Sequence, residues 1–260
     1  MDKASIGLWR QVNGRYRAVT PWPALPALVA TVVILGLGIL IGSVVGDLVE
    51  RWLVAYGREQ SAGRATSGSM FPIGQLARLA SVQGVVIVLV LLAAGALGGR
   101  TRAALGLEAM PGAATMLSAF AAMILLLVPY NLAVYVLSSE SMVQDLEPAA
   151  GLMRSHLAWL AVIVIGVGAP LSEELLFRGF LQSALAQSRI GYFGASLVTT
   201  MGWTALHAGY SPAGLTEVFL IGLLFSWLLW RTGSLWVPIF CHAAHNTLLL
   251  LILRLTELPA

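Results

Sequence analysis

The sequence is poor in charged residues, and this excludes a soluble globular domain. Only 10% of its 260 residues are charged, whereas 58% are hydrophobic and the mean hydropathy is +0.85. Soluble domains carry about 25% charged residues, because their surfaces must be solvated. We therefore expect an integral membrane protein. At about 20 residues per span, the chain has room for about seven transmembrane helices and for no separate soluble domain.

Cysteines and clustered basic residues are also scarce. The one cysteine, Cys241, cannot form an internal disulfide and offers no metal-binding spacing. The net charge of +3 comes from dispersed arginines rather than from a basic patch with interleaved aromatic residues. Nucleic acid is therefore excluded as a partner, and the lipid bilayer is the expected surroundings of the chain. No internal repeat is visible, so repeat-built transporter folds gain no support.

Long apolar runs predict an all-α fold, a polytopic transmembrane helical bundle. Residues 1–23 are basic and aromatic and are expected to form an N-terminal cytoplasmic segment, followed by an integral membrane domain at 24–260. The first apolar run reads as a retained anchor, and a cleaved signal peptide is the alternative. The expected spans are 24–46, 79–98, 113–137, 157–186, 192–208, 215–230 and 235–253.

The first span and the polar stretch after it carry two further predictions. Gly38, Gly42 and Gly46 recur at four-residue spacing, which lets another helix approach this face closely. Residues 47–78 include the sequence GREQSAGRATSGS, which is rich in Gly, Ser and Arg and has no helical period. We expect this stretch to be a loop.

The basic residues favour an orientation with the N-terminus inside, and the membrane is expected to be a bacterial cytoplasmic membrane. Positive charge collects on the cytoplasmic side of membrane proteins, and this orientation places nine basic residues there against six on the other side. The nine are Lys3, Arg10, Arg15, Arg17, Arg100, Arg102, Arg178, Arg189 and Arg231.

Three of the expected spans carry polar residues that do not belong in lipid. A charged group at mid-helix costs about 2.5 to 3.5 kcal/mol on insertion scales, so such residues face an internal cavity. They lie in the sequences SEELLFRGF, WTALHAG and CHAAHN, and they are Glu173, Glu174, Arg178, His207, His242, His245 and Asn246.

Helical spacing divides the first cluster. Residues at i and i+4 share a helix face, so Glu174 and Arg178 are expected to form a structural ion pair. Glu173 points about 100° away from that face and is free to meet groups from other helices. A buried, hydrogen-bonded acid is the alternative interpretation of Glu173.

The same spacing relates the residues of the other two clusters. Trp203 lies four residues before His207, so its indole can pack beside that imidazole, and His242 and Asn246 share one face. His245 is held only as a neighbour or lining residue. Together with Glu173, these groups supply a carboxylate, two imidazoles and an amide, which suit the activation of water and the stabilisation of an oxyanion.

At these residues the sequence resembles the CPBP family of intramembrane proteases, which includes type II CAAX prenyl endopeptidases and bacteriocin-immunity or abortive-infection proteins. The resemblance rests on the order EExxxR, then an aromatic residue followed four positions later by histidine, then HxxxN. It covers about residues 157–250, the expected protease-like core. Trp203 stands where the family more often has phenylalanine. Three motifs in this order are far more specific than any one of them.

The resemblance implies roles for these residues. Glu173 and His207 would activate the hydrolytic water, and His242 and Asn246 would form the oxyanion site. Glu174, Arg178 and Trp203 would support the site. We expect no cofactor and a glutamate-type mechanism. Zinc is the alternative, with Glu173, His207 and His242 as its ligands.

The sequence therefore predicts an intramembrane endopeptidase that hydrolyses peptide bonds of a membrane-associated protein or peptide. A prenylated C-terminal motif is one candidate substrate, and a bacterial sorting tail or a bacteriocin-related peptide is another. A proton- or ion-coupled transporter is an alternative, because glutamate and histidine also build proton relays in membranes. A noncatalytic scaffold with the same fold is a third interpretation.

Overall fold

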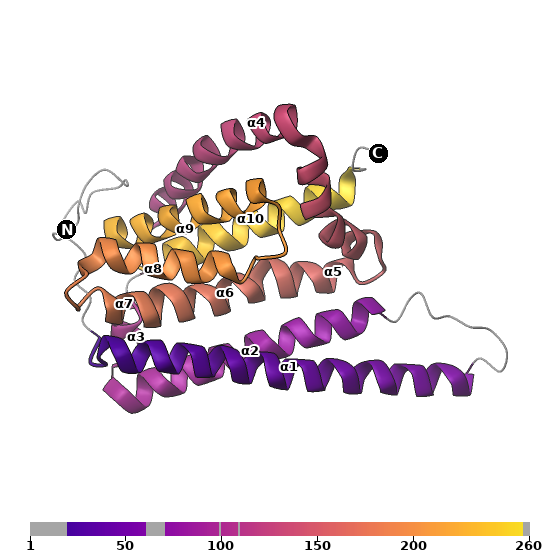
Figure 1. The fold of residues 1–260 in the computed structure, drawn as a ribbon, viewed down its shortest axis with the longest axis horizontal. Coiled ribbons are helices and arrows are strands. Elements are labelled where there is room, and N and C mark those ends of the chain that lie inside the picture. The colour runs from indigo at the N-terminus through magenta and orange to yellow at the C-terminus, as the bar shows by residue number, and fades with distance from the viewer. Residues whose placement is uncertain (1–19, 61–70, 99, 109, 257–260) are drawn as a thin grey trace.

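A computed structural model of the protein describes residues 20–60, 71–98, 100–108 and 110–256, and the regular structure in these ranges is helical (Figure 1). A helix satisfies its backbone hydrogen bonds within its own segment, as a hydrocarbon environment requires. The elements are α1 (Ala24–Gln60), α2 (Phe71–Gly98), α3 (Thr101–Ala104), α4 (Ala113–Arg154), α5 (Ala158–Ala161), η1 (Val162–Gly168), α6 (Ala169–Glu173), η2 (Glu174–Gln182), α7 (Ser183–Leu185), α8 (Gly191–Ala205), α9 (Pro212–Thr232) and α10 (Trp236–Leu255). Here η denotes a π-helical segment. The all-α bundle expected from the sequence is confirmed.

Six helices in the described part of the chain are long and apolar enough to span a membrane. They are α1, α2, α4, the continuous rod α5 to α7, α9 and α10. Large apolar side chains such as Leu25, Leu125 and Phe193 stay exposed on the bundle, as expected for a surface that faces lipid. The estimate of about seven spans included residues 192–208. That region forms α8, which has only 15 residues.

The predicted loop at 47–78 is wrong at both of its ends. Helix α1 continues to Gln60 and α2 begins at Phe71, so that only residues 61–70 lie outside the description. The chain between Pro26 and Pro72 contains no proline that would stop a helix. Arg78 Nη2 also donates to Asp47 Oδ1 over 2.9 Å, and this bond ties the polar ends of the two helices together.

The close approach predicted for the glycine face of α1 is confirmed. A Cβ atom added at Gly38 would lie 3.3 Å from a methyl group of Val86 on α2. One added at Gly42 would lie 2.9 Å from the carbonyl oxygen of Arg78, and one at Gly46 would lie 2.9 Å from Arg78 Cβ. The missing side chains therefore let the backbones of α1 and α2 pack directly against each other.

Helix α4 is bent. Ser138 has φ −160° and ψ 61°, outside the helical region, and Figure 1 shows α4 arching over α9 and α10. The expected span 113–137 ends one residue before this bend. The 16 residues that follow, up to Arg154, belong to the same element but run in another direction.

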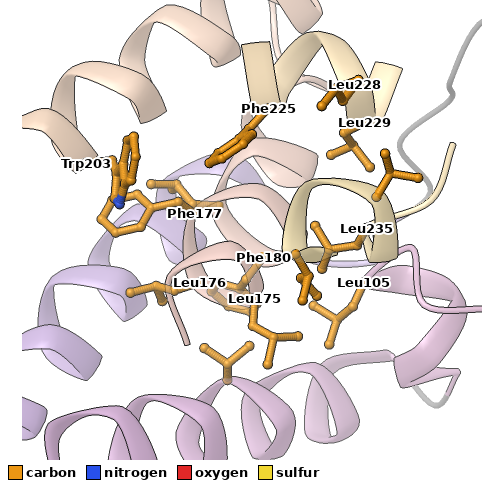
Figure 2. Close-up of a cluster of buried hydrophobic side chains, with 14 of the residues drawn as sticks. Leu105, Leu175, Leu176, Phe177, Phe180, Trp203, Phe225, Leu228, Leu229 and Leu235 are labelled. Carbon is orange, nitrogen blue, oxygen red and sulfur yellow. The ribbon is translucent and has the colours of Figure 1, made fainter. Parts of the chain in front are cut away.

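The segment η2 lies at the centre of the bundle, and all nine of its residues are buried. Figure 2 shows Leu175, Leu176, Phe177 and Phe180 of η2 among apolar side chains of α8, α9 and the α9–α10 connection. Of the expected segment 1–23, the structure describes residues 20–23. Here the Trp22 ring stacks on Phe180 with centroids 4.9 Å apart, and Trp22 Nε1 donates to the Phe180 carbonyl.

Candidate active site

The rod that carries both glutamates is irregular next to Pro170. In π-helical register the carbonyl of Ile165 would accept from the N–H of residue 170, but proline has none. Asn246 Nδ2 of α10 donates to Ile165 O over 3.2 Å and so replaces the missing donor. Thr247 Oγ1 makes a longer contact of 3.5 Å with Gly166 O. These bonds place α10 beside the rod, about two turns before Glu173.

Glu174, Arg178 and His242 form a buried polar cluster. Arg178 Nη1 donates to Glu174 Oε1 over 3.0 Å, and both side chains are fully buried, which confirms the predicted pair. His242 Nδ1 lies 3.0 Å from the same oxygen. Because a carboxylate only accepts, Nδ1 of His242 is the donor in this contact. Glu174 therefore fixes the orientation of the imidazole, a role that the motif spacing did not reveal.

Glu173 ends α6 and is half-buried. Its Oε2 accepts a hydrogen bond of 2.5 Å from Trp203 Nε1 on α8. The expectation that Glu173 turns away from the ion pair and meets another helix is therefore confirmed. This bond occupies one carboxylate oxygen and leaves Oε1 of Glu173 for other contacts.

His207 lies in the turn between α8 and α9 and is half-buried. Its Nδ1 is 3.1 Å from the carbonyl oxygen of Trp203, so Nδ1 is the donor in this contact and, in the neutral imidazole, Nε2 keeps its lone pair. The imidazole lies edge-on to the Trp203 ring at 5.1 Å and to the Tyr210 ring at 5.4 Å between centroids. This tautomer leaves Nε2 able to accept a proton.

Trp203 joins the predicted clusters. Its ring centroid lies 5.1 Å from that of His207 and 5.4 Å from that of His242, and its N–H bonds Glu173. The Arg178 guanidinium lies over the same ring at 4.5 Å. The structure thus gathers Glu173, His207 and His242 around one indole, although the sequence predicted only that Trp203 packs beside His207.

Asn246 is placed differently. It follows His242 by one turn of α10, but its Nδ2 donates to Ile165 O. This bond gives Asn246 a part in packing α10 against η1. Its role at an oxyanion stays a prediction, as does the role of His245.

The residues do not fit the alternative zinc site as they lie. Within the described ranges, no group of three His, Cys, Asp or Glu side chains is arranged to hold a metal ion. Glu173, His207 and His242 therefore do not form a three-ligand set in this arrangement.

The family comparison matches two parts of the chain. Residues 155–248 match the model described as type II CAAX prenyl endopeptidase Rce1-like, and this range contains every predicted site residue. Residues 22–59, which cover most of α1, match the model of a conserved transmembrane helix of mechanosensitive ion channels. That second match concerns one helix outside the site.

Two curated bacterial proteins are similar to the chain. One is the "Putative membrane peptidase YdiL" of Bacillus subtilis (strain 168), which is 33% identical over 88 residues, 34% of this chain and 35% of that protein. The other is an "Uncharacterized 24.3 kDa protein" of Escherichia coli, which is 36% identical over 95 residues, 35% of this chain and 43% of that protein. The matches thus span less than half of either relative.

No solved structure matches the chain significantly. The family match and the order of the three motifs nevertheless agree on the same region. The six apolar helices place this region in an integral membrane protein. Residues 155–248 therefore resemble the CPBP family of intramembrane proteases both in their three motifs and in their match to the Rce1-like model.

Proposed function

We propose that the protein is an intramembrane endopeptidase of the glutamate type, which hydrolyses a peptide bond of a membrane-associated substrate. The observation that carries this proposal is the gathering of Glu173, His207 and His242 around the Trp203 indole. A carboxylate and two imidazoles packed around one indole supply both a base for water and a donor for an oxyanion.

In this mechanism Glu173 and His207 act on the water. Trp203 holds Oε2 of Glu173, so Oε1 is the oxygen that accepts the proton. Nε2 of His207 is the second acceptor, since Nδ1 faces the Trp203 carbonyl. The hydroxide then attacks the peptide carbonyl, and the proton is returned to the leaving amine.

His242 and Asn246 are the proposed donors to the tetrahedral oxyanion. In this role the His242 imidazole donates from both nitrogens, from Nδ1 to Glu174 and from Nε2 to the oxyanion. It therefore carries two protons and a positive charge. Glu174 Oε1 faces that charge at 3.0 Å, and Arg178 Nη1 donates to the same oxygen. For Asn246 to donate to the oxyanion, its amide must either release the Ile165 carbonyl or donate one N–H to that carbonyl and the other to the substrate oxygen.

The direct test is cleavage of quenched fluorescent peptides by the full chain in proteoliposomes. The panel contains one C-terminal CAAX-type peptide with and without a farnesyl group, and a peptide with a hydrophobic bacterial sorting tail. We expect Glu173→Gln to lower turnover by about 10² to 10⁴, the usual contribution of a general base. Folding is retained, because the glutamine oxygen still accepts from Trp203.

A matched control is Glu147→Gln, which removes an exposed carboxylate paired with Arg154. Turnover of this control at the parent rate shows that the loss in Glu173→Gln is specific. Turnover near the parent rate by Glu173→Gln removes this residue from the mechanism. If the parent cleaves none of the peptides but moves protons across the vesicle membrane, the transporter interpretation replaces the peptidase.

The metal question has its own test, because the proposal uses no zinc. Purified protein is expected to hold no stoichiometric zinc and to keep its activity after strong chelators. One zinc per chain, with activity lost on chelation and restored by zinc, would contradict the glutamate-type mechanism and make Glu173, His207 and His242 ligands.

We further propose a bacterial cytoplasmic membrane, with the N-terminus inside. The two curated relatives are bacterial, and the basic residues favour this orientation. The structure removes Arg178 from that count, since its guanidinium is fully buried against Glu174. Eight basic residues then remain against six. Labelling of single cysteines placed in the α2–α3 and α4–α5 connections of intact cells tests the orientation.

A further inference from the structure

The turn that carries His207 has few contacts of its own. Residues 206–211 connect α8 to α9, and Ala208, Gly209 and Tyr210 are exposed. The bonds within the turn are local backbone bonds, such as that from Tyr210 N to the His207 carbonyl over 2.9 Å. The position of the imidazole therefore depends on what holds the two ends of the turn.

The end at α8 is held by Trp203, and the end at α9 is held by Asp145. Asp145 Oδ1 accepts from the Ser211 backbone N–H over 2.7 Å, and its Oδ2 accepts from the Ser211 hydroxyl over 2.6 Å. Ser211 is 7% exposed and is the N-cap of α9, since its Oγ accepts from the Gly214 N–H over 3.1 Å. One carboxylate thus accepts from both hydrogen-bond donors of Ser211, the residue at which the turn becomes a helix.

The bend in α4 is what brings Asp145 to this place. Tyr130 and Asn131, before the bend at Ser138, bind the Ala213 carbonyl and Glu217 over 2.7 and 2.6 Å. Asp145 lies after the bend and reaches the start of the same helix. The two arms of α4, visible as an arch in Figure 1, therefore hold the first turns of α9 from two directions.

The charge of Asp145 also suits this position. A helix N-terminus carries a partial positive charge, and a carboxylate there accepts charge-assisted bonds. The Tyr210 phenol lies in the same turn, and its pKa is raised by partial burial and by the negative charges of Asp145 and Glu173. The turn therefore lies in the electrostatic field of both carboxylates, and Tyr210 packs on His207.

We propose that Asp145 is a positioning residue, which holds the turn 206–211 through Ser211 and so keeps His207 beside Trp203 and Glu173. The inference rests on the proposed peptidase function only for its activity measurement. It assigns no contact between Asp145 and the substrate. It gives the bent second half of α4, outside the family match, a part in the site.

The test uses the full chain in detergent, labelled with ¹⁵N-histidine. The sequence has four histidines, so the imidazole signals are few and are assigned by single substitutions. We expect Asp145→Ala and Ser211→Ala to shift or broaden the His207 signals and leave those of His242 unchanged. Amide exchange at residues 206–214 should become roughly tenfold faster, as for the loss of a helix cap.

The activity measurement uses the farnesylated peptide in proteoliposomes. A misplaced base lowers the chemical step, so kcat is expected to fall about tenfold or more while KM stays within about twofold. Ser211→Thr keeps the hydroxyl and is expected to retain activity and the His207 signals. Glu147→Gln removes a carboxylate two residues further along α4 and serves as the matched control.

The outcomes separate the two proposals. His207 signals and exchange that stay unchanged in Asp145→Ala overturn the positioning role, as do equal shifts of His207 and His242, which indicate a general loss of packing. If Asp145→Ala does not fold, Ser211→Ala decides by the same criteria. A parent protein that cleaves no peptide refutes the proposed function, whereas the resonance and exchange measurements still test the role of Asp145.

Discussion

The α1–α2 hairpin and the bundle from η1 to α10 each contain an ion pair of nearly the same length in different surroundings. Arg78 and Asp47 are 2.9 Å apart, with 42% and 57% of their side chains exposed. Arg178 and Glu174 are 3.0 Å apart and fully buried. The distances alone do not distinguish the pairs. The exposure to solvent distinguishes them. When one member of a buried pair is removed, the remaining charge has no water to solvate it.

The second difference lies in how the helices meet. In the hairpin the backbones approach through glycines, and the contact needs no polar group. In the bundle, hydrogen bonds cross between helices: Trp203 to Glu173, His242 to Glu174 and Asn246 to the Ile165 carbonyl. The hairpin can tolerate polar changes at its ends, whereas the bundle depends on particular donors and acceptors.

The largest effect is expected from breaking the buried pair. Arg178→Ala removes the guanidinium that pairs with the fully buried Glu174, and we expect a loss of about 3 to 5 kcal/mol of stability. Glu174→Gln should also lower stability, because it weakens the contacts to both Arg178 and His242. Thermal unfolding in detergent measures both. If the two variants melt like the parent but lose activity, the pair belongs to the chemistry rather than to the fold.

The next prediction concerns Asn246. Asn246→Ala should slow peptide turnover by about 10² to 10³, as for the loss of an oxyanion donor. Thr247→Val is the control, because it removes only the neighbouring contact to the Gly166 carbonyl. Turnover measured beside the melting temperature separates the roles. If both variants lose the same stability and keep the turnover of the parent, Asn246 is not an oxyanion donor and acts only through its bond to the Ile165 carbonyl.

A smaller effect is expected from filling the glycine face. In Gly42→Val the first added carbon would lie 2.9 Å from the Arg78 carbonyl oxygen, so α1 and α2 must separate. Overpacking of this kind costs about 1 to 3 kcal/mol. Gly36→Val is the matched control, since a Cβ at Gly36 meets nothing within 4 Å. Melting temperatures in detergent compare the two. Equal stabilities would contradict the close packing.

The smallest effect is expected at the exposed pair. Asp47→Asn removes a salt bridge that water and ions already screen, so the change in stability is about 1 kcal/mol or less. The same melting measurement, repeated at low and high salt, checks it. A loss as large as that of Arg178→Ala would show that exposure does not separate the two pairs.

The parts of the molecule that the sequence predicted are those governed by local spacing. The pairing of Glu174 with Arg178 and the packing face of Gly38, Gly42 and Gly46 follow from positions four residues apart on one helix. The separate direction of Glu173 follows from the same geometry. Such predictions need no knowledge of neighbouring helices.

Contacts between helices could not be predicted in the same way. That His242 meets Glu174 rather than Glu173 depends on the rotation and depth of α10 relative to the rod, which no spacing determines. The contribution of Asp145 depends on a bend at Ser138, a residue without a distinctive local signal. The prediction of a loop at 47–78 was wrong because it relied on the Gly, Ser and Arg content of this stretch, although no proline interrupts the chain between Pro26 and Pro72. Pro170 was the one visible clue to the irregular rod.

The shortness of α8 has a consequence for what can reach the site. Its 15 residues give a length of about 22 Å, roughly 8 Å less than the hydrocarbon thickness of a bilayer. A helix that starts at one face of the membrane and stops this early leaves its terminal turn, with His207, below the opposite face. A folded domain cannot follow it there. Under the proposed peptidase function, we therefore expect the substrate to offer the scissile bond on a flexible tail that is long enough to reach that depth.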